Sequence, residues 1–469
     1  MELLDQIRAD LGAKYVVTGT DAEAWTRDWM NVYHWQPLAV VRPASTEQVQ
    51  AIARACSAAA VAMVPVGGNT GLTGATKAQD AVMISLDRMN AIREIKPNAQ
   101  VAIVESGAIL DSIHQAVDVH NLVFPLFFGA RGSAMIGGNL STNAGGSNVL
   151  RYGNTRDLCL GLEVVLADGR VMNLMSELRK DNTGLNLKHM FIGAEGTLGI
   201  ITAAVVRLYH KPLAYVTAMV GLRALEDSLP LLNRLQNETG GGVEAFEYMP
   251  RHYIERHMDK IESALEPFDD VHEVNILVEV ATTRASDLEQ DGSGTPKLQA
   301  ILETALMDMI EAGSAQDVVI AQNEAQRRVM WERRESAAEI TVGVPGSIDT
   351  DVAVPLDDVP AFLQQVSARV QEIDPDGQDF YISHLGDGNL HYTFYPSDTS
   401  GVFKEPITEA IEDVVLALNG SFSAEHGIGL SKRNSMARRK DPVALEMMRA
   451  IKSAFDPANL MNPGKVYPD

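Results

Sequence analysis

The sequence is poor in cysteine, because only Cys56 and Cys159 occur in its 469 residues. Two cysteines cannot supply a disulfide framework, a cysteine-ligated zinc site or a four-cysteine iron–sulfur cluster. Cys56 lies in an Ala-rich helical pattern and Cys159 in an apolar strand pattern. We therefore expect two buried, unreactive thiols.

Long apolar runs are also missing. No stretch approaches the roughly 20 residues that a membrane-spanning helix needs, and residues 1–14 lack the basic, then apolar, then small-residue order of a signal peptide. We expect a chain that does not span a membrane and that stays in the cytoplasm.

Basic residues are outnumbered, since 39 Lys and Arg stand against 62 Asp and Glu and give a formal net charge of −23. This balance argues against a nucleic-acid partner, because phosphate contacts need a basic face. It does not argue against a small anionic substrate, since a local Arg or metal ion can make the charge of one pocket positive. The length predicts at least two domains.

Short β-branched runs and helical patterns alternate along the chain. In the first third, strands at 38–41 and 61–66 flank a helix whose N-cap we expect to be Ser45. After about residue 210 the pattern predicts strands at 215–222, 243–248, 274–280 and 318–321 and helices at 225–236, 297–310 and 324–340. This order is typical of an α+β domain with an antiparallel sheet and helices on one face.

Three glycine-rich loops lie at 67–74, 129–146 and 193–199. The first follows a strand and contains no acid, so its backbone N–H groups can approach a phosphate. It is neither a Walker A loop nor a Rossmann fingerprint, and the third loop precedes a strand where a Rossmann loop precedes a helix. Each loop alone could be an ordinary tight turn. Together they indicate a long cofactor with two phosphates.

Residues 380–395 form two strand-like runs joined at Asp387-Gly388, a strong hairpin dipeptide. A turn centred there makes His384 face His391 and places Ile382 and Thr393 on the same side. Cross-strand Cβ atoms lie roughly 5 Å apart, so two imidazoles held in this way could bind one divalent ion. The alternative is the usual role of a histidine in a strand, as an ordinary core or surface residue.

A third ligand must come from elsewhere, and Glu425-His426-Gly427 offers a carboxylate beside an imidazole. One of the two could bind the metal while the other reaches the substrate, and the residues alone leave open which does which. Two His and one carboxylate leave coordination positions free, as a catalytic metal requires.

Three motifs, Pro65–Gly71, His384–His391 and Glu425–Gly427, together resemble a known family. It is the FAD-linked oxidase and dehydrogenase superfamily typified by vanillyl-alcohol oxidase, and within it the D-lactate and D-2-hydroxyglutarate dehydrogenase group. The resemblance extends from Val40 to Lys465. It implies an α+β fold with a PCMH-type FAD-binding domain of two α/β subdomains in residues 1–212 (core about 37–212), an antiparallel-sheet substrate-binding cap domain in 213–420, and a helical C-terminal segment in 421–469 that returns to the FAD domain.

The resemblance implies that FAD accepts a hydride at flavin N5 from a D-2-hydroxy acid, D-2-hydroxyglutarate or D-lactate, which becomes the 2-oxo acid. Some relatives link FAD covalently through a His in the first glycine loop, but residues 67–74 contain none, so we expect non-covalent FAD. Lys465 would lie on the flavin side. The expected FAD contacts are Pro65, Val66, Gly67, Gly68, Asn69, Thr70, Gly71, Leu72, Gly129, Ser133, Gly137, Gly138, Ser141, Thr142, Asn143, Gly146, Glu195, Gly196, Gly199, Ile200, Ile201 and Asn462.

The resemblance also implies roles for the polar motifs. His384, His391 and Glu425 would bind a divalent metal, expected to be zinc, and His426 would be the catalytic base. Arg334 would grip the substrate carboxylate, which suits the fork of a guanidinium group. The neighbouring Arg333 leaves the choice between the two arginines open.

The sequence departs from the 2-hydroxyglutarate pattern at two positions. Asp349 stands where those relatives tend to carry a Lys, and Thr393 stands where an Asn is expected. An acid in place of a base is unfavourable near a dicarboxylate. The substrate is therefore either shorter, such as D-lactate, or bound in another way.

Three other functions remain open: an FAD oxidase that produces hydrogen peroxide, an electron-transfer subunit of a glycolate-oxidase-like complex, and a metal-dependent hydrolase without flavin. For a dehydrogenase, the electron acceptor could be electron-transfer flavoprotein, a quinone or a cytochrome. A homodimer is common for this fold.

Overall fold

The computed structural model describes residues 3–468 except 291, 293, 342 and 343. It divides the chain into two compact units. Unit 1 consists of Met1–Gly146, Tyr152–Lys211 and Glu425–Asp469, and unit 2 of Ser147–Arg151 and Pro212–Ala424. The expected domain bounds at 212/213 and 420/421 stay a prediction.

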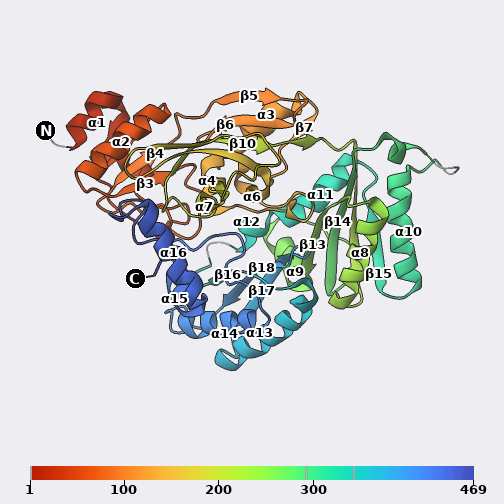
Figure 1. The fold of residues 1–469 in the computed structure, drawn as a ribbon. Helices are drawn as coiled ribbons and strands as arrows, with labels where there is room; N and C mark the ends of the chain where they lie inside the picture. The colour runs from red at the N-terminus through yellow and green to blue at the C-terminus, as the bar shows by residue number, and fades with distance from the viewer. Residues whose placement is uncertain (1–2, 291, 293, 342–343, 469) are drawn as a thin grey trace. The chain divides into compact units, whose positions relative to one another are not determined.

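Unit 1 is built on two larger sheets and a two-stranded ribbon (Figure 1). The four-stranded sheet has the order β1 (Val16–Val17), β2 (Ala39–Val41), β4 (Val82–Ser85), β3 (Met63–Val66). The five-stranded sheet has the order β5 (Ile92–Lys96), β6 (Val101–Glu105), β10 (Ile200–Arg207), β8 (Cys159–Val165), β9 (Val171–Leu174). The ribbon pairs β7 (Leu122–Val123) with β11 (Tyr209–His210).

Helices complete the two α/β subdomains of unit 1. As expected, Ser45 caps α2, because its side chain accepts a hydrogen bond from Gln48 N at 3.3 Å. Val165 and Ile200 of the five-stranded sheet share a core with Val41 of the four-stranded sheet, so the subdomains are packed together. The helices are α1 (Leu3–Leu11), α2 (Thr46–Ala58), α3 (Leu110–Asp118), α4 (Ile136–Thr142), α6 (Thr155–Leu158), α7 (Lys188–Phe191), α15 (Arg433–Arg439) and α16 (Pro442–Phe455).

The C-terminal segment is part of unit 1. After α16 the chain runs beside the edge strand β3, where Met63 N donates to Leu460 O at 2.7 Å and Asn462 N donates to Met63 O at 2.8 Å. These bonds bring Asn462 to the strand that leads into the first glycine loop.

Unit 2 holds one seven-stranded sheet whose recorded pairings are all antiparallel. Its strand order is β15 (Ala315–Ile320), β12 (Ala214–Leu222), β14 (Val274–Thr282), β13 (Val243–Pro250), β17 (Gln378–His384), β18 (Asn389–Tyr395), β16 (Ile348–Ala353). The antiparallel sheet of the predicted α+β fold is thereby confirmed.

Helices cover both faces of this sheet, so the prediction of helices on one face is wrong. One face packs under α8 (Ser228–Thr239), α10 (Lys297–Glu311), α13 (Val359–Ile373) and α14 (Lys404–Ala417). The other packs against α9 (Arg251–Lys260), α11 (Glu324–Glu335) and α12 (Ala337–Thr341). Successive strand residues serve opposite faces, as Ile276 packs in the first core and Leu277 in the second.

Both cysteines are buried, as predicted, and burial raises the pKa of each thiol to about 12. Among the described residues, no helix combines the length and apolarity needed to cross a bilayer.

Candidate functional site

The first glycine loop leaves β3 in unit 1. A side chain at Gly68 would overlap the carbonyl of Ser133, so only glycine lets the second glycine loop approach this closely. Among the described residues, the backbone N–H groups of residues 68–72 have no hydrogen-bond partner. A row of unpaired N–H groups beside a glycine-lined approach fits a pyrophosphate.

The third glycine loop joins the same place. Glu195 N donates to Ser141 O, in α4, at 2.8 Å. Gly196 has a φ of +73°, and a Cβ there would lie 2.6 Å from Pro65 Cγ. Unit 1 therefore gathers the expected FAD contacts from all three loops.

Asn462 and Lys465 return to these loops. The Asn462 side chain donates to Glu195 O at 2.7 Å and to Ala75 O at 3.0 Å. Lys465 Nζ donates to Asn462 Oδ1 at 3.2 Å, and burial, together with the nearby Lys77, lowers the Lys465 pKa to about 8. A cation at this place suits an anionic cofactor.

The Glu195 carboxylate holds the segment that follows Glu425 and His426. It accepts hydrogen bonds from Ile428 N at 2.7 Å and Gly429 N at 2.8 Å. A Cβ at Gly427, where φ is +79°, would meet Glu195 Oε1 at 2.8 Å. Burial raises the Glu195 pKa to about 7 although the two N–H groups oppose the shift. Glu195 thus ties the third glycine loop to the predicted catalytic segment.

The histidine hairpin of unit 2 has a different register from the predicted one. His384 pairs with Asn389, and Ile382 pairs with His391. The turn occupies residues 385–388, so its centre lies one residue earlier than predicted and each pairing shifts by two. A shift of two keeps every side chain on its face. His384 and His391 are diagonal neighbours, and their ring centroids lie 5.4 Å apart.

His384 lies in a buried charge cluster with Glu247 and Arg334. Glu247 Oε1 is 3.0 Å from His384 Nδ1, and Arg334 Nε donates to Glu247 Oε2 at 2.6 Å. Arg334 Nη2 is 3.1 Å from His384 Nε2. Burial alone would raise the Glu247 pKa, but His384 and Arg334 outweigh it and lower the pKa.

Arg334, and not Arg333, lies beside His384. The Arg333 guanidinium instead donates to Leu265 O at 3.0 Å, and burial lowers its pKa. Sequence reasoning missed Glu247, since nothing in the local pattern of β13 marks it as the partner of Arg334.

His391 lies beside a second residue that the sequence analysis missed. It pairs across the strands with Asp351, whose carboxylate is fully buried and lies 3.9 Å from His391 Nδ1. The only sequence signal for Asp351 is its place in a strand that also carries Asp349 on the same face. Both Asp351 and His391 are residue types that bind divalent metals.

The backbone connects this pair to the other predicted ligand. Ala424 N donates to Asp351 O at 3.2 Å, and Glu425 is the next residue in the chain. Glu425 Oε1 lies 3.9 Å from His426 Nε2. Unit 2 thus brings a carboxylate and an imidazole together at Asp351 and His391, and the next part of unit 1 begins with the carboxylate and imidazole of Glu425 and His426.

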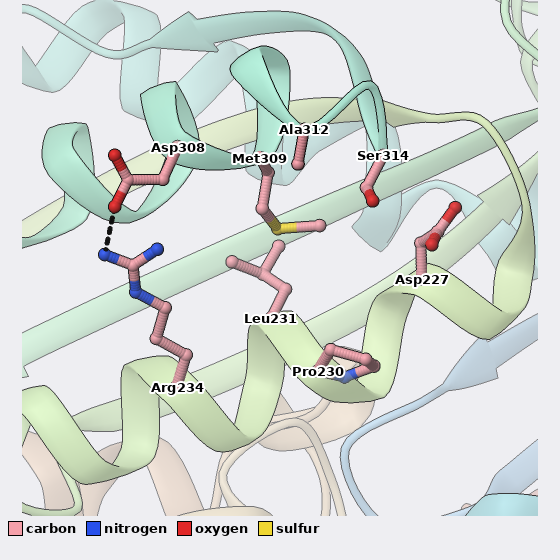
Figure 2. A pocket seen from close by; sticks show the side chains of 8 residues that line it. All are labelled: Asp227, Pro230, Leu231, Arg234, Asp308, Met309, Ala312 and Ser314. Atoms are coloured by element: carbon pink, nitrogen blue, oxygen red, sulfur yellow. Dashed lines mark hydrogen bonds and ion pairs between the residues drawn. The ribbon is translucent and has the colours of Figure 1, made fainter.

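A cavity of about 280 Å³ between α8 and α10 has a different character (Figure 2). Leu231 and Met309 line it, and the Arg234–Asp308 ion pair, 2.7 Å long, crosses from one helix to the other. These helices cover the opposite face of the sheet from the histidines. The cavity contains no histidine and none of the predicted site residues.

Comparison with known families decides the classification. Residues 211–466, more than half of the chain, match the family described as FAD linked oxidases, C-terminal domain, and residues 37–175 match the FAD binding domain family. The chain belongs to the FAD-linked oxidases. The first two glycine loops lie within the FAD binding domain match.

The relatives of this chain are named as enzymes. The chain is 34% identical to a D-2-hydroxyglutarate dehydrogenase of Stutzerimonas stutzeri (strain A1501), over 99% of this chain and 98% of the relative. It is also 34% identical to a mitochondrial D-2-hydroxyglutarate dehydrogenase of Bos taurus, over 94% of this chain and 79% of the relative. This chain is therefore an FAD-dependent dehydrogenase of that family.

The fold agrees with the predicted PCMH type. This chain superposes on p-cresol methylhydroxylase with a TM-score of 0.72 and 17% identity, over all of this chain and 96% of that one. This likeness concerns the fold alone.

Proposed function

We propose that the protein oxidises a D-2-hydroxy acid to the corresponding 2-oxo acid. The observation that carries this proposal is the Arg334–Glu247–His384 cluster beside His391 in unit 2. The buried guanidinium lies beside His384, whose ring is 5.4 Å from that of His391, so an anchor for a carboxylate stands near donors for a metal. The names of the relatives, which are D-2-hydroxyglutarate dehydrogenases, support the same substrate class.

Each residue has a role in the proposed site. Arg334 binds the substrate carboxylate, and Glu247 keeps the guanidinium in place. His384, His391 and Glu425 are the proposed ligands of a divalent metal, expected to be zinc, and Asp351 is a further donor beside His391. A His384 tautomer that donates Nδ1–H to Glu247 would leave the Nε2 lone pair, which now lies 3.1 Å from Arg334 Nη2, as the one that could bind a metal.

His426 acts as the base that takes the proton of the 2-hydroxyl group. A bound metal would supply the Lewis acid that lowers the pKa of that hydroxyl group, and bound FAD would supply N5 as the acceptor of the hydride from C2. FAD is held without a covalent bond, since the first glycine loop has no histidine. The electron acceptor (electron-transfer flavoprotein, a quinone or a cytochrome), a homodimeric state and a cytoplasmic location belong to the same proposal.

Anaerobic flavin bleaching tests the reaction. We expect D-lactate or D-2-hydroxyglutarate to bleach the absorbance near 450 nm while the L-enantiomers leave it unchanged. The proposal is wrong if no D-2-hydroxy acid reduces the flavin, and a colourless protein would favour the hydrolase. Peroxide measured against dye reduction separates an oxidase from a dehydrogenase.

The proposed base has its own test. His426→Ala should retain FAD and lose turnover, while the exposed His120→Ala is the matched control and keeps both. A normal kcat in His426→Ala would remove His426 from the mechanism. Chelator treatment should inactivate the wild type, and added zinc should restore it.

A further inference from the structure

An acid lies next to the proposed site, on the same face of the unit 2 sheet. Asp349 in β16 pairs across the strands with Thr393 in β18. Thr393 Oγ1 donates to Asp349 Oδ1 at 2.8 Å, and Ser347 Oγ donates to Asp349 Oδ2 at 2.9 Å. Asp349 is exposed, whereas Thr393 is buried. The two hydroxyl groups fix the position of a carboxylate that solvent and solutes can reach.

The strand register places this acid on a definite side of His391. The Asp351–His391 pair is the middle of three successive rows on this face. On one side of it lies His384, with Arg334 against it. On the other side lies the Asp349–Thr393 row. Successive rows are about 7 Å apart, because a strand rises about 3.4 Å per residue.

A bound 2-hydroxy acid would follow the same order. Its carboxylate goes to Arg334 and its 2-hydroxyl group to the His391 row, so the substituent on C2 points away from Arg334. That direction leads toward Asp349. The far carboxylate of a five-carbon acid extends further along it than the methyl group of a three-carbon acid.

We infer that Asp349 is a specificity-determining residue that selects D-2-hydroxy acids whose far end is uncharged or donates hydrogen bonds, and disfavours those with a second carboxylate. This inference rests on the proposed function. It predicts a preferred substrate other than the one in the names of the relatives, because 2-hydroxyglutarate carries a carboxylate at its far end.

The size of the effect follows from the exposure of Asp349. Two like charges several ångströms apart in a solvated site repel modestly, so we expect discrimination of about tenfold and not complete exclusion. Salt screens exposed charges, since the Debye length falls from about 10 Å at 0.1 M to about 3 Å at 1 M. The discrimination should therefore weaken as ionic strength rises.

The test compares kcat/KM for D-2-hydroxyglutarate, D-lactate and D-glycerate in the FAD-loaded, zinc-loaded protein. The wild type should prefer D-lactate or D-glycerate. Asp349→Asn keeps the shape of the side chain and an acceptor for Thr393, and it should raise the ratio of D-2-hydroxyglutarate to D-lactate about tenfold. Glu372→Gln is the matched control, because it removes an exposed acid from α13 on the opposite face and should leave the ratio unchanged.

A measurement on the wild type keeps the inference testable if Asp349→Asn does not fold. Raising the salt from 0.05 to 0.5 M should raise the same ratio, and glutarate should inhibit less strongly than propionate at low salt. Equal kcat/KM values for the two acids, with no effect of salt or of Asp349→Asn, would overturn the inference while leaving the proposed function in place. Failure of every D-2-hydroxy acid to bleach the flavin would instead overturn the proposed function.

Discussion

At the scale of single residues, two buried carboxylates of unit 2 each hold an arginine of α11. Glu247 holds Arg334, and Glu279 accepts two hydrogen bonds from Arg327, at 2.7 and 2.8 Å. Both carboxylates are nearly inaccessible to solvent. Of these two arginines, Arg334 is the one that lies beside His384. Comparing the two pairs therefore distinguishes a structural role from the proposed role in substrate binding.

We predict that Glu247→Gln raises KM for the hydroxy acid at least tenfold. The variant leaves Arg334 without its counter-charge, and breaking a buried pair costs about 3 kcal/mol or more. Both variants should lower Tm by similar amounts, because each breaks a buried pair. Glu279→Gln should leave KM nearly unchanged. Steady-state kinetics and thermal unfolding of both variants measure this. An equal rise in KM for both would contradict a specific role for Glu247.

Glu195 gives a pH prediction. Its pKa rises on folding from an ordinary 4.5 to about 7, so the carboxyl group favours the folded state below pH 4.5 and loses this contribution as the pH rises through 7. Glu195→Gln removes the titration. The stability of the variant relative to the wild type should increase by up to about 3 kcal/mol between pH 5 and pH 8.

Thermal unfolding of FAD-loaded protein across pH 5 to 8 measures this difference. The exposed Glu23→Gln should show the wild-type dependence on pH. A difference between wild type and Glu195→Gln that is constant across this range would show that the Glu195 carboxyl group titrates outside it.

At the scale of elements, the sequence predicted the secondary structure better than its pairing. The Ser45 cap and strands such as β12, expected at 215–222, follow from local pattern and were placed to within a residue or two. The register of the His384–His391 hairpin was wrong because the turn uses four residues centred on 386–387, and a dipeptide signal does not fix that centre. The prediction that His384 and His391 share one face was still correct, because a pairing shift of two residues keeps each side chain on its face.

Long-range partners could not be predicted. Glu247 and Arg334 lie 87 residues apart, and Asp351 and His391 meet only when β16 pairs with β18. Helix α9 also went unassigned, since most of its residues are charged or histidine and few are apolar. Helices on the second face of the sheet follow from tertiary packing that no local pattern encodes.

The hairpin turn gives a prediction for this scale. Gly388 has a φ of +80°, and a Cβ there would overlap the carbonyl of Val354, whose N–H donates to Gly388 O at 3.1 Å. Gly388→Ala should destabilise the protein by about 1–3 kcal/mol and reduce bound zinc, because the turn joins the strands of His384 and His391.

Gly313→Ala is the matched control for Gly388→Ala. Gly313 also has a positive φ, +73°, but a Cβ there meets no atom within 4 Å. It should lose some stability and keep its zinc. Thermal unfolding and metal analysis of the two purified variants measure their stability and zinc content. An unchanged zinc content in Gly388→Ala would show that the turn does not support metal binding.

At the scale of the whole molecule, the residues of the proposed reaction are divided between the two units. Unit 1 supplies the glycine loops together with the segment of Glu425 and His426, and unit 2 supplies Arg334, His384 and His391. The chain enters the last part of unit 1 at Glu425, directly after Ala424 is bonded to Asp351.

This division predicts that FAD and metal can be lost separately. Gly68→Ala places a methyl group against the Ser133 carbonyl, which should displace the first glycine loop and abolish FAD binding while the zinc content stays near the wild-type level. His391→Ala should lose zinc and retain FAD, because His391 lies in unit 2 and the glycine loops lie in unit 1. The exposed His120→Ala, which lies outside the glycine loops of unit 1, should keep both. Absorbance near 450 nm and metal analysis of the same preparations give the two readings, and loss of FAD and zinc together in folded Gly68→Ala or His391→Ala would show that the two sites do not load independently.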